Sequence, residues 1–330
     1  MNYSKFKKAL IIPYFGKFNN YFKFWLISCS YNEDYDFLIF TDDHTKYNFP
    51  QNVKVSYLSF CEMHNKIQSL FDFKISLKSP YKLCDYKPAY GHIFMDDLRG
   101  YDFWGYCDTD LIFGHLSDFY TDEILAEYDK ISDAGHFTLF RNNVSMRYAY
   151  KTLSSYKCYD YKSVFSNEKN FAFDEWGYNK GINRLLLENK LSIYYKPIWF
   201  SDIRINSFGL YNTRAEYDLT ERAKLERAKK NIVFSFSEGY LVQYSIVNGR
   251  VERNEEAYVH LQKRPMKINA IHNESSFLIC PPNRFVDFEE IDYSFLKKIN
   301  TNRIYWHYIK IRFNNLKRKI KNFLKIKVKK

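Results

Sequence analysis

The first 115 residues alternate short apolar runs with stretches of helical pattern, and this alternation limits the possible folds more than any other feature of the sequence. The apolar runs at residues 9–12 and 37–40 are too short for helices and have the composition of buried strands, while residues 20–30 between them have a helical pattern. Short buried strands separated by helices are typical of a mostly parallel sheet that helices cover on both faces. The sequence therefore predicts an α/β fold.

The same pattern continues to residue 108 and becomes less regular beyond residue 115. We expect strands at residues 53–60, 102–108, 136–141, 232–237, 240–247 and 257–261, and helices at residues 62–71, 81–98 and 174–189. Hairpin turns are expected near Gly239 and at Asn248-Gly249. Because no linker rich in Pro, Gly or Ser interrupts the pattern, the sequence favours one domain over residues 1–295, followed by a tail at residues 296–330.

Two carboxylates, Asp108 and Asp110, stand at the end of the apolar strand expected at residues 102–108, and another apolar run follows them. Side chains two residues apart in an extended segment point the same way, about 6.5–7 Å apart. Two buried carboxylates at that separation repel each other unless a cation or protons intervene. Mg²⁺ and Mn²⁺ prefer oxygen ligands and often complete their shell with water and substrate phosphates. The spacing favours a metal bound jointly by protein and diphosphate as much as a turn in which Asp108 caps backbone amides and Asp110 faces solvent.

Residues 80–114, PYKLCDYKPAYGHIFMDDLRGYDFWGYCDTDLIFG, resemble the nucleotide-sugar-binding half of GT-A type glycosyltransferases. The similarity is to an uncharacterised bacterial family found with surface-polysaccharide genes, and the segments IIPYFG at residues 11–16 and HLQKR at residues 260–264 also match its pattern. The resemblance covers nearly all of residues 5–285. It implies a GT-A-like Rossmann-type mixed sheet covered by helices and a nucleoside-diphosphate sugar donor. It also implies that Asp108 and Asp110 hold Mn²⁺ or Mg²⁺ on the donor diphosphate, with Asp108 contacting either the metal or the ribose.

The HLQKR segment supplies further candidates through the same resemblance. Related GT-A enzymes often add a histidine late in the chain to the metal, and His260 resembles that ligand. Lys263 and Arg264 would bring positive charge to the diphosphate, and the alternative is a solvated basic turn. A lone histidine is more often structural than a ligand, so a structural role is expected for the other seven, His44, His64, His92, His115, His136, His272 and His307.

The ends of the first two expected strands carry candidates for binding the nucleotide. These candidates are Pro13, Tyr14, Phe15, Asp42 and Asp43. The two carboxylates would accept hydrogen bonds from the ribose hydroxyls or the base, as acidic residues do in other nucleotide-binding sheets, or would cap the next helix. Residues 13–16 would form a backbone turn near the base, and with a single glycine this turn is not a phosphate-binding loop.

The remaining candidates lie on segments expected to be helical. Asp85 and Lys87 are two residues apart and so do not share a helix face. One of them would reach the donor while the other orients the loop, or either would have a surface role. Asp174 and Glu175 stand beside Trp176, whose aromatic face suits a sugar ring, and are the candidates for the acid–base or nucleophilic role. The alternative for this acidic pair is the cap and first turn of a helix.

The net charge of +12 comes from the end of the chain. Residues 303–330 contain eleven Lys or Arg and no Asp or Glu, which leaves 39 basic and 38 acidic residues in the rest. Apolar residues of this tail recur at steps of three and four, at Trp306, Ile309, Phe313, Leu316, Ile320 and Phe323. This pattern predicts a basic amphipathic helix on an anionic membrane surface, with nucleic-acid binding or packing on the protein body as alternatives.

Cysteine usage and hydropathy favour a cytoplasmic protein, and the basic tail would make it peripheral on the inner face of the membrane. The six cysteines form no CxxC pair, the N-terminal apolar run is too short for a signal peptide, and no window approaches 18 apolar residues. With the resemblance, these observations predict a metal-dependent glycosyltransferase that extends a cell-surface glycan, with a glycan or lipid-linked glycan as acceptor. The alternative is a non-catalytic basic protein that binds nucleic acid or an anionic surface and uses the acidic pair structurally.

Overall fold

A computed structural model of the chain describes residues 5–154, 158–175, 180–195, 199–205, 207–213 and 221–299, and residues 306, 309, 310, 312, 313, 316 and 317. The chain divides into two compact units. Unit 1 comprises Met1–Leu111 and His115–Lys196, and unit 2 comprises Ile112–Gly114 and Pro197–Lys330. Each unit is described by itself below. The domain boundary expected near residue 295 stays a prediction.

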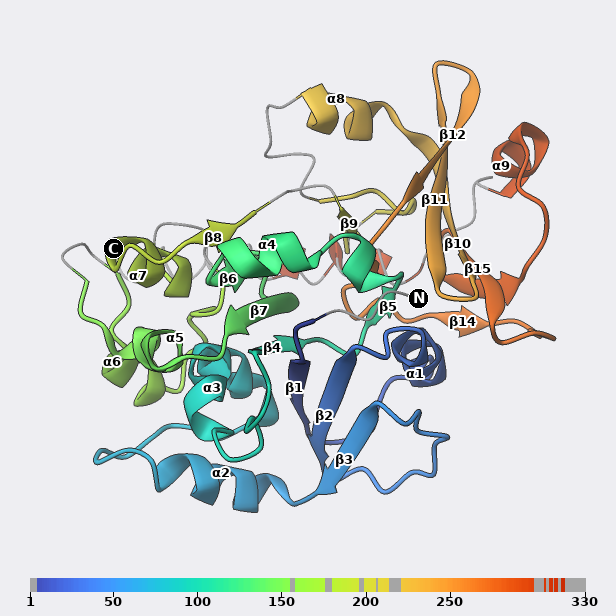
Figure 1. The fold of residues 1–330 in the computed structure, drawn as a ribbon. Helices are drawn as coiled ribbons and strands as arrows, with labels where there is room; N and C mark the ends of the chain where they lie inside the picture. Colours follow the sequence, from blue (N-terminus) through green and yellow to red (C-terminus); the bar gives the residue numbers. More distant parts are fainter. Residues whose placement is uncertain are drawn as a thin grey trace, which may run out of the picture. The chain divides into compact units, whose positions relative to one another are not determined.

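The described part of unit 1 is built on a seven-stranded sheet, drawn in Figure 1. Its strands, in spatial order, are β3 (Val53–Tyr57), β2 (Tyr35–Thr41), β1 (Lys8–Tyr14), β4 (Phe103–Cys107), β7 (Phe137–Arg141), β6 (Lys130–Ile131) and β8 (Ile193–Tyr194). The first four strands in this order are parallel to one another. β7 is antiparallel to its two neighbours, β4 and β6. The predicted α/β class is confirmed, and so are the strands expected in the first 115 residues, within a few residues at their ends.

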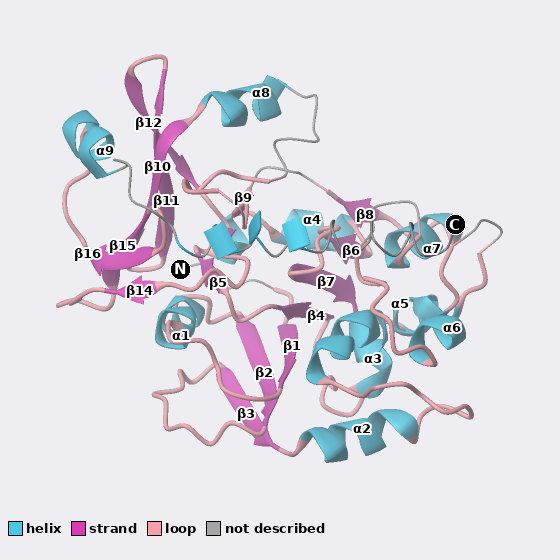
Figure 2. Cartoon of the chain, turned by 180° about the vertical axis from the view of Figure 1, so that it is seen from behind, coloured by secondary structure: helices cyan, strands magenta, loops and turns pink. Residues whose placement is uncertain are grey.

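Helices cover both faces of the parallel strands. In Figures 1 and 2, α1 (Phe22–Ser30) lies on one side of β1–β3, and α2 (Phe60–Gln68) and α3 (Tyr90–Ile93) lie on the other. Alternate strand residues serve the two faces: Ile11 belongs to the core beneath α2 and α3, whereas Phe37 packs against Trp25 of α1. Burial on both faces explains why these strands read as continuous apolar runs.

Other short helices complete unit 1. They are η2 (Leu116–Asp118), α4 (Asp122–Glu127), α5 (Val144–Tyr148), η3 (Ala149–Lys151), α6 (Tyr161–Phe165) and α7 (Ile182–Glu188). The helix expected at residues 81–98 is instead η1, a 3₁₀ segment at Pro80–Ala89, followed by the single turn of α3. Pro88 inside this segment cannot donate the backbone hydrogen bond that an α-helix needs, which accounts for the difference.

The helix expected at residues 174–189 begins only at Ile182, so the prediction that Asp174 and Glu175 start a helix is wrong. Ala172 adopts a left-handed backbone conformation, and the Glu175 amide donates to the Ala172 carbonyl, which makes a turn in place of a helix. The alternative in which this acidic pair caps a helix therefore fails as well.

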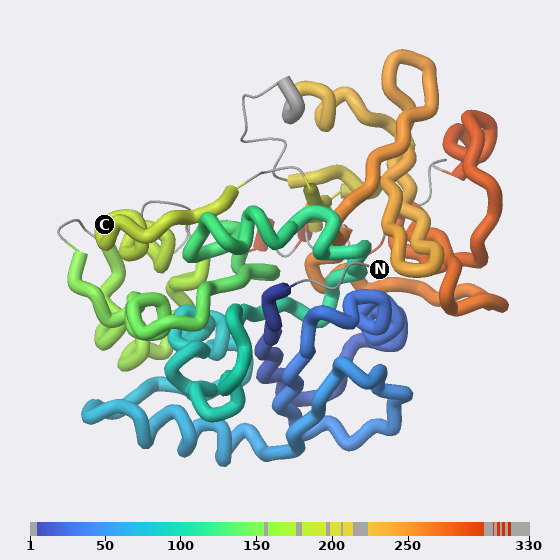
Figure 3. The backbone as a smooth tube through the Cα atoms, viewed as in Figure 1, coloured from blue at the N-terminus to red at the C-terminus, as the bar shows by residue number. Residues whose placement is uncertain are grey.

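The described residues of unit 2 form two sheets. The larger has the order β12 (Arg250–Glu255), β11 (Tyr240–Val247), β10 (Lys230–Ser237), β15 (Ser276–Cys280), β16 (Arg284–Asp287) and β14 (Lys267–Ile268). Figure 3 follows the hairpins that join β10, β11 and β12. Their turns lie at Glu238-Gly239 and Asn248-Gly249, all with positive φ, so both predicted hairpin turns are confirmed. The smaller sheet has the order β5 (Leu111–Phe113), β13 (Tyr258–His260) and β9 (Phe200–Asp202).

The described part of unit 2 also includes the helices α8 (Glu221–Ala228) and α9 (Tyr293–Ile299). Leu296 of α9 packs in a cluster with residues of β10, β11 and β15. Beyond α9, the described residues Trp306, Ile309, Phe313 and Leu316 are helical and exposed. Ile320 and Phe323 lie outside the described residues, so the continuous basic helix stays a prediction. None of the described helices is both long and apolar enough to cross a membrane.

Candidate functional site

The predicted site residues of unit 1 gather at one edge of its sheet. β1, β2 and β4 are parallel neighbours, so their carboxyl ends meet at the same edge. Tyr14 is paired with Thr41 at the last position of β1 and β2, and Asp42-Asp43 follow directly. Asp108 follows the last residue of β4. The prediction that both acidic pairs stand at strand ends is confirmed.

Asp42 and Asp43 hold the loop that follows β1. The Gly16 amide donates to Oδ1 of Asp42 at 2.7 Å, and Gly16 has the positive φ of 95° that favours glycine. Lys17 Nζ donates to Oδ1 of Asp43 at 2.6 Å, and the Phe18 amide donates to Oδ2 at 3.1 Å. Burial alone would raise the pKa of Asp43, but hydrogen bonds from Lys17 and Thr45 lower it below its usual range.

The alternative in which Asp42 and Asp43 cap a helix is wrong. No helix begins in the fully described segment at residues 42–59, and the next helix, α2, is capped by Ser59. Asp42 remains exposed and Asp43 is buried, so Asp42 is the one of the two whose carboxylate faces solvent.

The loop after β1 also contacts the turn that carries Asp108 and Asp110, which we call the DxD pair. Asn19 Nδ2 donates to the Thr109 carbonyl at 3.0 Å. Tyr14 stacks on Phe18, with ring centroids 4.6 Å apart. Burial, followed by the negative charges of Asp110 and Asp43, raises the pKa of Tyr14, so the field of Asp110 reaches the end of β1. Tyr14 and Asp110 therefore share one electrostatic environment.

Pro13 and Phe15 differ in exposure. Pro13 is half-buried, whereas Phe15 is buried in the main core and packs edge-on against Phe60 at 5.4 Å. Phe15 therefore anchors the loop, and its side chain points toward the core.

The DxD pair itself is unequal in exposure. The side chain of Asp108 is 31% exposed, and Asp110 is only 4% exposed. The alternative in which Asp110 faces solvent is therefore wrong. Lys87 Nζ donates to Oδ1 of Asp108 at 2.8 Å and to the Gly135 carbonyl at 2.6 Å. Lys87 thus balances part of the negative charge of Asp108 and Asp110, which the sequence alone suggested a cation would balance.

Lys87 also lies 3.5 Å from Oδ2 of Asp174, which is buried. Burial alone would lower the pKa of Lys87, but Asp108 and Asp174 outweigh this effect and raise it, so the amine stays charged. Burial raises the pKa of Asp174 to about 8, although the charge of Lys87 opposes the rise. Glu175, the neighbouring candidate, is exposed.

Asp85 and Lys87 are both buried, so the alternative of a surface role is wrong for both. Asp85 is fully buried and accepts hydrogen bonds from Lys82 Nζ at 2.7 Å and from the amides of Phe171 and Phe173 at 3.0–3.1 Å. These bonds fix the segment that leads to Asp174. Asp85 thus orients a loop, and Lys87 faces the DxD pair.

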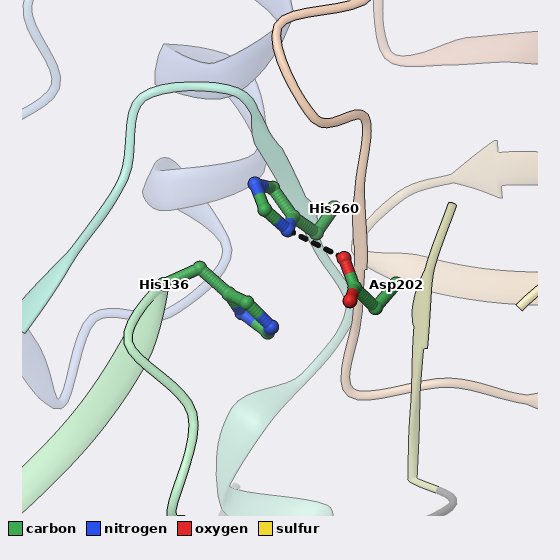
Figure 4. Close-up of side chains that lie close together, drawn as sticks. All are labelled: His136, Asp202 and His260. Atoms are coloured by element: carbon green, nitrogen blue, oxygen red, sulfur yellow. Dashed lines mark hydrogen bonds and ion pairs between the residues drawn. The ribbon is translucent and has the colours of Figure 1, made fainter. Parts of the chain in front are cut away.

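In unit 2, His260 and Asp202 form a buried pair. They are register partners on the parallel strands β13 and β9, and His260 Nδ1 lies 2.8 Å from Oδ1 of Asp202, as Figure 4 shows. Gln262 Nε2 donates to the same carboxylate oxygen at 2.7 Å.

The two basic residues after Gln262 differ. Lys263 is exposed, whereas Arg264 is fully buried and donates to the carbonyls of Pro282 at 2.5 Å and Arg204 at 2.7 Å. The alternative of a solvated basic turn is wrong for Arg264, because its guanidinium anchors the chain from inside.

β5 pairs with β13 so that the end of β5 lies beside the start of β13. The Gly114 amide donates to the Ala257 carbonyl at 2.8 Å, and the rings of Phe113 and Tyr258 are 6.4 Å apart. The residue after β5 therefore bonds to the residue before β13, so the two strands run antiparallel.

Buried aspartate and histidine side chains that could hold a metal ion are present among the described residues. In unit 1 they include Asp110 and His136, and in unit 2 Asp202 and His260. Carboxylate oxygens with imidazole nitrogen form a donor set compatible with Mn²⁺.

The sequence matches a family of unknown function, DUF6625, over residues 10–289. The chain belongs to this family. No curated protein sequence matches the chain. The DUF6625 match includes every strand end described above and the HLQKR segment, and it stops before the basic tail.

Within the DUF6625 region, sequence reasoning missed the partners of the predicted residues. Asp202 ends a strand of only three residues, too short for an alternating pattern to show. His136 stood in the sequence as an isolated histidine, with no ligand spacing around it. The contact of Lys87 with Asp108 joins residues 21 positions apart through a 3₁₀ segment, and no motif spacing announces it.

Proposed function

We propose that the chain is a metal-dependent glycosyltransferase with a GT-A-like organisation, which moves a sugar from a nucleoside-diphosphate donor to a cell-surface glycan or lipid-linked glycan. The observation that carries this proposal is the acidic edge of unit 1, where the ends of β1, β2 and β4 bring together the 14–19 loop, Asp42 and the Asp108–Asp110 turn. Open α/β sheets bind their ligands at this edge.

Mn²⁺ or Mg²⁺ would be held by Asp108, Asp110 and His260. Asp110 offers a buried carboxylate in unit 1 and His260 a buried imidazole in unit 2. The ligand role of His260 rests on the resemblance of the HLQKR segment. The ion would supply Lewis acidity, stabilising the negative charge that develops on the leaving diphosphate. Lys263, exposed and basic, would contact the same phosphates.

The acidic edge supports cation binding even though Lys87 already pairs with Asp108. The edge also carries Asp110, a second and buried carboxylate. Carboxylate oxygens are the ligands that Mg²⁺ and Mn²⁺ prefer.

Glu175 is the better candidate for exchanging a proton with the acceptor hydroxyl. It is exposed, whereas Asp174 is buried, lies 3.5 Å from Lys87 and has its pKa raised to about 8. A general base must reach the proton that it removes, and a buried carboxyl does so poorly.

A non-catalytic basic protein that binds nucleic acid or an anionic surface remains the second candidate. The Lys87–Asp108 ion pair favours it, because that contact gives Asp108 a structural role without any metal. Its affinity would fall steeply with salt, as binding to phosphate backbones does, and it would show no nucleotide-sugar preference.

Nucleotide-sugar hydrolysis tests the enzymatic proposal. A panel of UDP- and GDP-sugars is first screened with Mn²⁺ by thermal shift, since a preferred donor stabilises the fold in proportion to its occupancy. For the preferred donor we expect turnover that EDTA abolishes and that Asp110→Ala lowers by about 100-fold or more, as loss of a charge-stabilising group does.

Asp36→Asn is the matched control, because Asp36 belongs to a second acidic pair of the same spacing, Asp34-Tyr35-Asp36, and forms a partly exposed ion pair with Lys54. This variant should keep full turnover. Turnover that is indifferent to both EDTA and Asp110→Ala would remove the metal mechanism.

A further inference from the structure

We propose that Asp202 is a positioning residue that orients the His260 imidazole and fixes its proton on Nδ1, so that Nε2 is the atom presented to a cation. The inference rests on the proposed function, in which His260 is a metal ligand. It assigns a role to Asp202, a residue to which no sequence motif points. The contacts that support it all lie within unit 2.

The contact geometry selects one ring nitrogen. His260 Nδ1 lies 2.8 Å from Oδ1 of Asp202, and both residues are buried. A carboxylate can only accept a hydrogen bond, so the nitrogen beside it carries the proton. A neutral imidazole has one N–H, and its other nitrogen, Nε2, then has the lone pair that binds metals. A carboxylate behind a ligating histidine also raises the basicity of the ring.

Asp202 is itself held from several sides. Its backbone pairs with His260 in the β9–β13 register, and the Ile203 amide donates to the His260 carbonyl at 3.0 Å. The Thr213 amide donates to the Asp202 carbonyl at 2.7 Å, and Gln262 Nε2 donates to Oδ1 at 2.7 Å. Because both main chain and side chain are fixed, the carboxylate has a defined direction, and so does the ring that it holds.

These contacts also give a physical account of the HLQKR segment. His260 and Gln262 both bind Asp202, while Arg264 donates to the carbonyl of Arg204, two residues beyond Asp202. Every second residue of the segment is thus tied to the end of β9, which makes the segment a brace for the imidazole.

The chain contains a second pair of the same type that serves as a comparison. His272 Nδ1 contacts Oδ2 of Asp287, but the His272 side chain is 85% exposed. Exposed pairs of this kind contribute little, and the imidazole has no rigid surroundings. Asp287→Asn therefore removes the same chemical contact at a place where no ligand is proposed.

The first test reads the tautomer in metal-free protein. Histidine labelled with ¹³C and ¹⁵N distinguishes Nδ1–H from Nε2–H by NMR, and His260→Ala assigns the signal. We expect the Nδ1–H form of His260 in the wild-type chain and its loss in Asp202→Asn. A His260 signal in the Nε2–H form would overturn the proposal, and this result requires no variant of Asp202 to fold.

The second test measures Mn²⁺ affinity by electron paramagnetic resonance, without substrate. We expect Asp202→Asn to weaken binding by about 10–100-fold, as loss of such a carboxylate partner does, and Asp287→Asn to leave it unchanged. Equal affinity in the wild type and in folded Asp202→Asn would overturn this inference alone, provided that His260→Ala and Asp110→Ala still weaken binding. Absence of Mn²⁺ binding by the wild-type chain would overturn the proposed function as well.

Discussion

Lys87 donates to Asp108 and to the Gly135 carbonyl and lies 3.5 Å from Asp174, so the charge of the acidic edge depends on how these groups share protons. Burial raises the pKa of Asp174 to about 8, and a protonated Asp174 leaves Lys87 to pair with Asp108. If Asp174 ionises, Lys87 is drawn between two carboxylates. The negative charge that Asp108 could offer to the proposed cation is therefore coupled to the protonation of Asp174.

Asp174→Asn should flatten the dependence of stability on pH. The folded pKa of Asp174, about 8, lies above the ordinary value of an aspartate, so between those values the folded state holds a proton that the unfolded state has lost. The contribution of Asp174 to the free energy of unfolding is thus largest below about pH 4. It falls as pH rises toward 8, by at most about 1.4 kcal/mol per pH unit. Urea unfolding of the wild type and of Asp174→Asn from pH 5 to pH 8 measures how the free energy of unfolding changes with pH. Equal slopes for the two proteins would contradict a raised pKa of Asp174.

The position of the acidic residues could be predicted because a strand end is a local property of sequence. Asp42 and Asp108 each follow an apolar run, and parallel neighbours must end at one edge. Their partners could not be predicted, since Lys87 reaches Asp108 and Asp202 reaches His260 through tertiary packing.

Among the elements, η1 fixes a segment that is distant in the sequence. Its residue Asp85 accepts hydrogen bonds from backbone amides at residues 171–173. Asp85 also pairs with Lys82, and both side chains are almost completely buried. The same short segment therefore places Lys87 at the DxD pair and holds the turn before Asp174.

Asp85→Asn should destabilise unit 1 by about 3–5 kcal/mol, because it leaves the Lys82 ammonium buried without its counter-charge. Chemical denaturation measures the change. Asp36→Asn is the control, since the Lys54–Asp36 pair is partly exposed and its loss should cost less than about 1 kcal/mol. Equal costs for the two variants would show that burial does not decide the contribution of Asp85.

Element prediction succeeded where the apolar period was long enough to read. The strands and helices of the first 70 residues and the hairpins of β10–β12 follow from it. It failed for η1, where proline prevents an α-helix, and it missed β5 and β9, whose three residues contain less than two full periods of a strand.

For the molecule as a whole, charge is divided between a nearly neutral body and a basic end. Residues 303–330 hold eleven Lys or Arg and no acidic residue, and the DUF6625 match ends at residue 289. The family region therefore carries the proposed chemistry. The tail lies outside the family match, and we propose that it places the protein on the inner face of the membrane, near the proposed lipid-linked acceptor.

Membrane attachment predicts separate effects of charge and of the apolar face. The described residues Trp306, Ile309, Phe313 and Leu316 are helical and exposed, which is the arrangement that an interfacial helix requires. Each basic residue near an anionic surface contributes about 1 kcal/mol before screening by salt. Deleting residues 303–330 should therefore release the protein from liposomes that contain anionic lipid, as measured by co-sedimentation.

One variant and one change of lipid separate the two contributions. Trp306→Ser with Phe313→Ser keeps every charge and should weaken attachment even at low salt, because it removes buried apolar area. Wild-type protein on liposomes of neutral lipid should bind far less than on anionic ones. Equal retention of the wild-type and truncated chains would show that the tail does not anchor the protein. Retention of the Ser variant on nucleic acid but not on lipid would instead assign the basic charge to phosphate backbones.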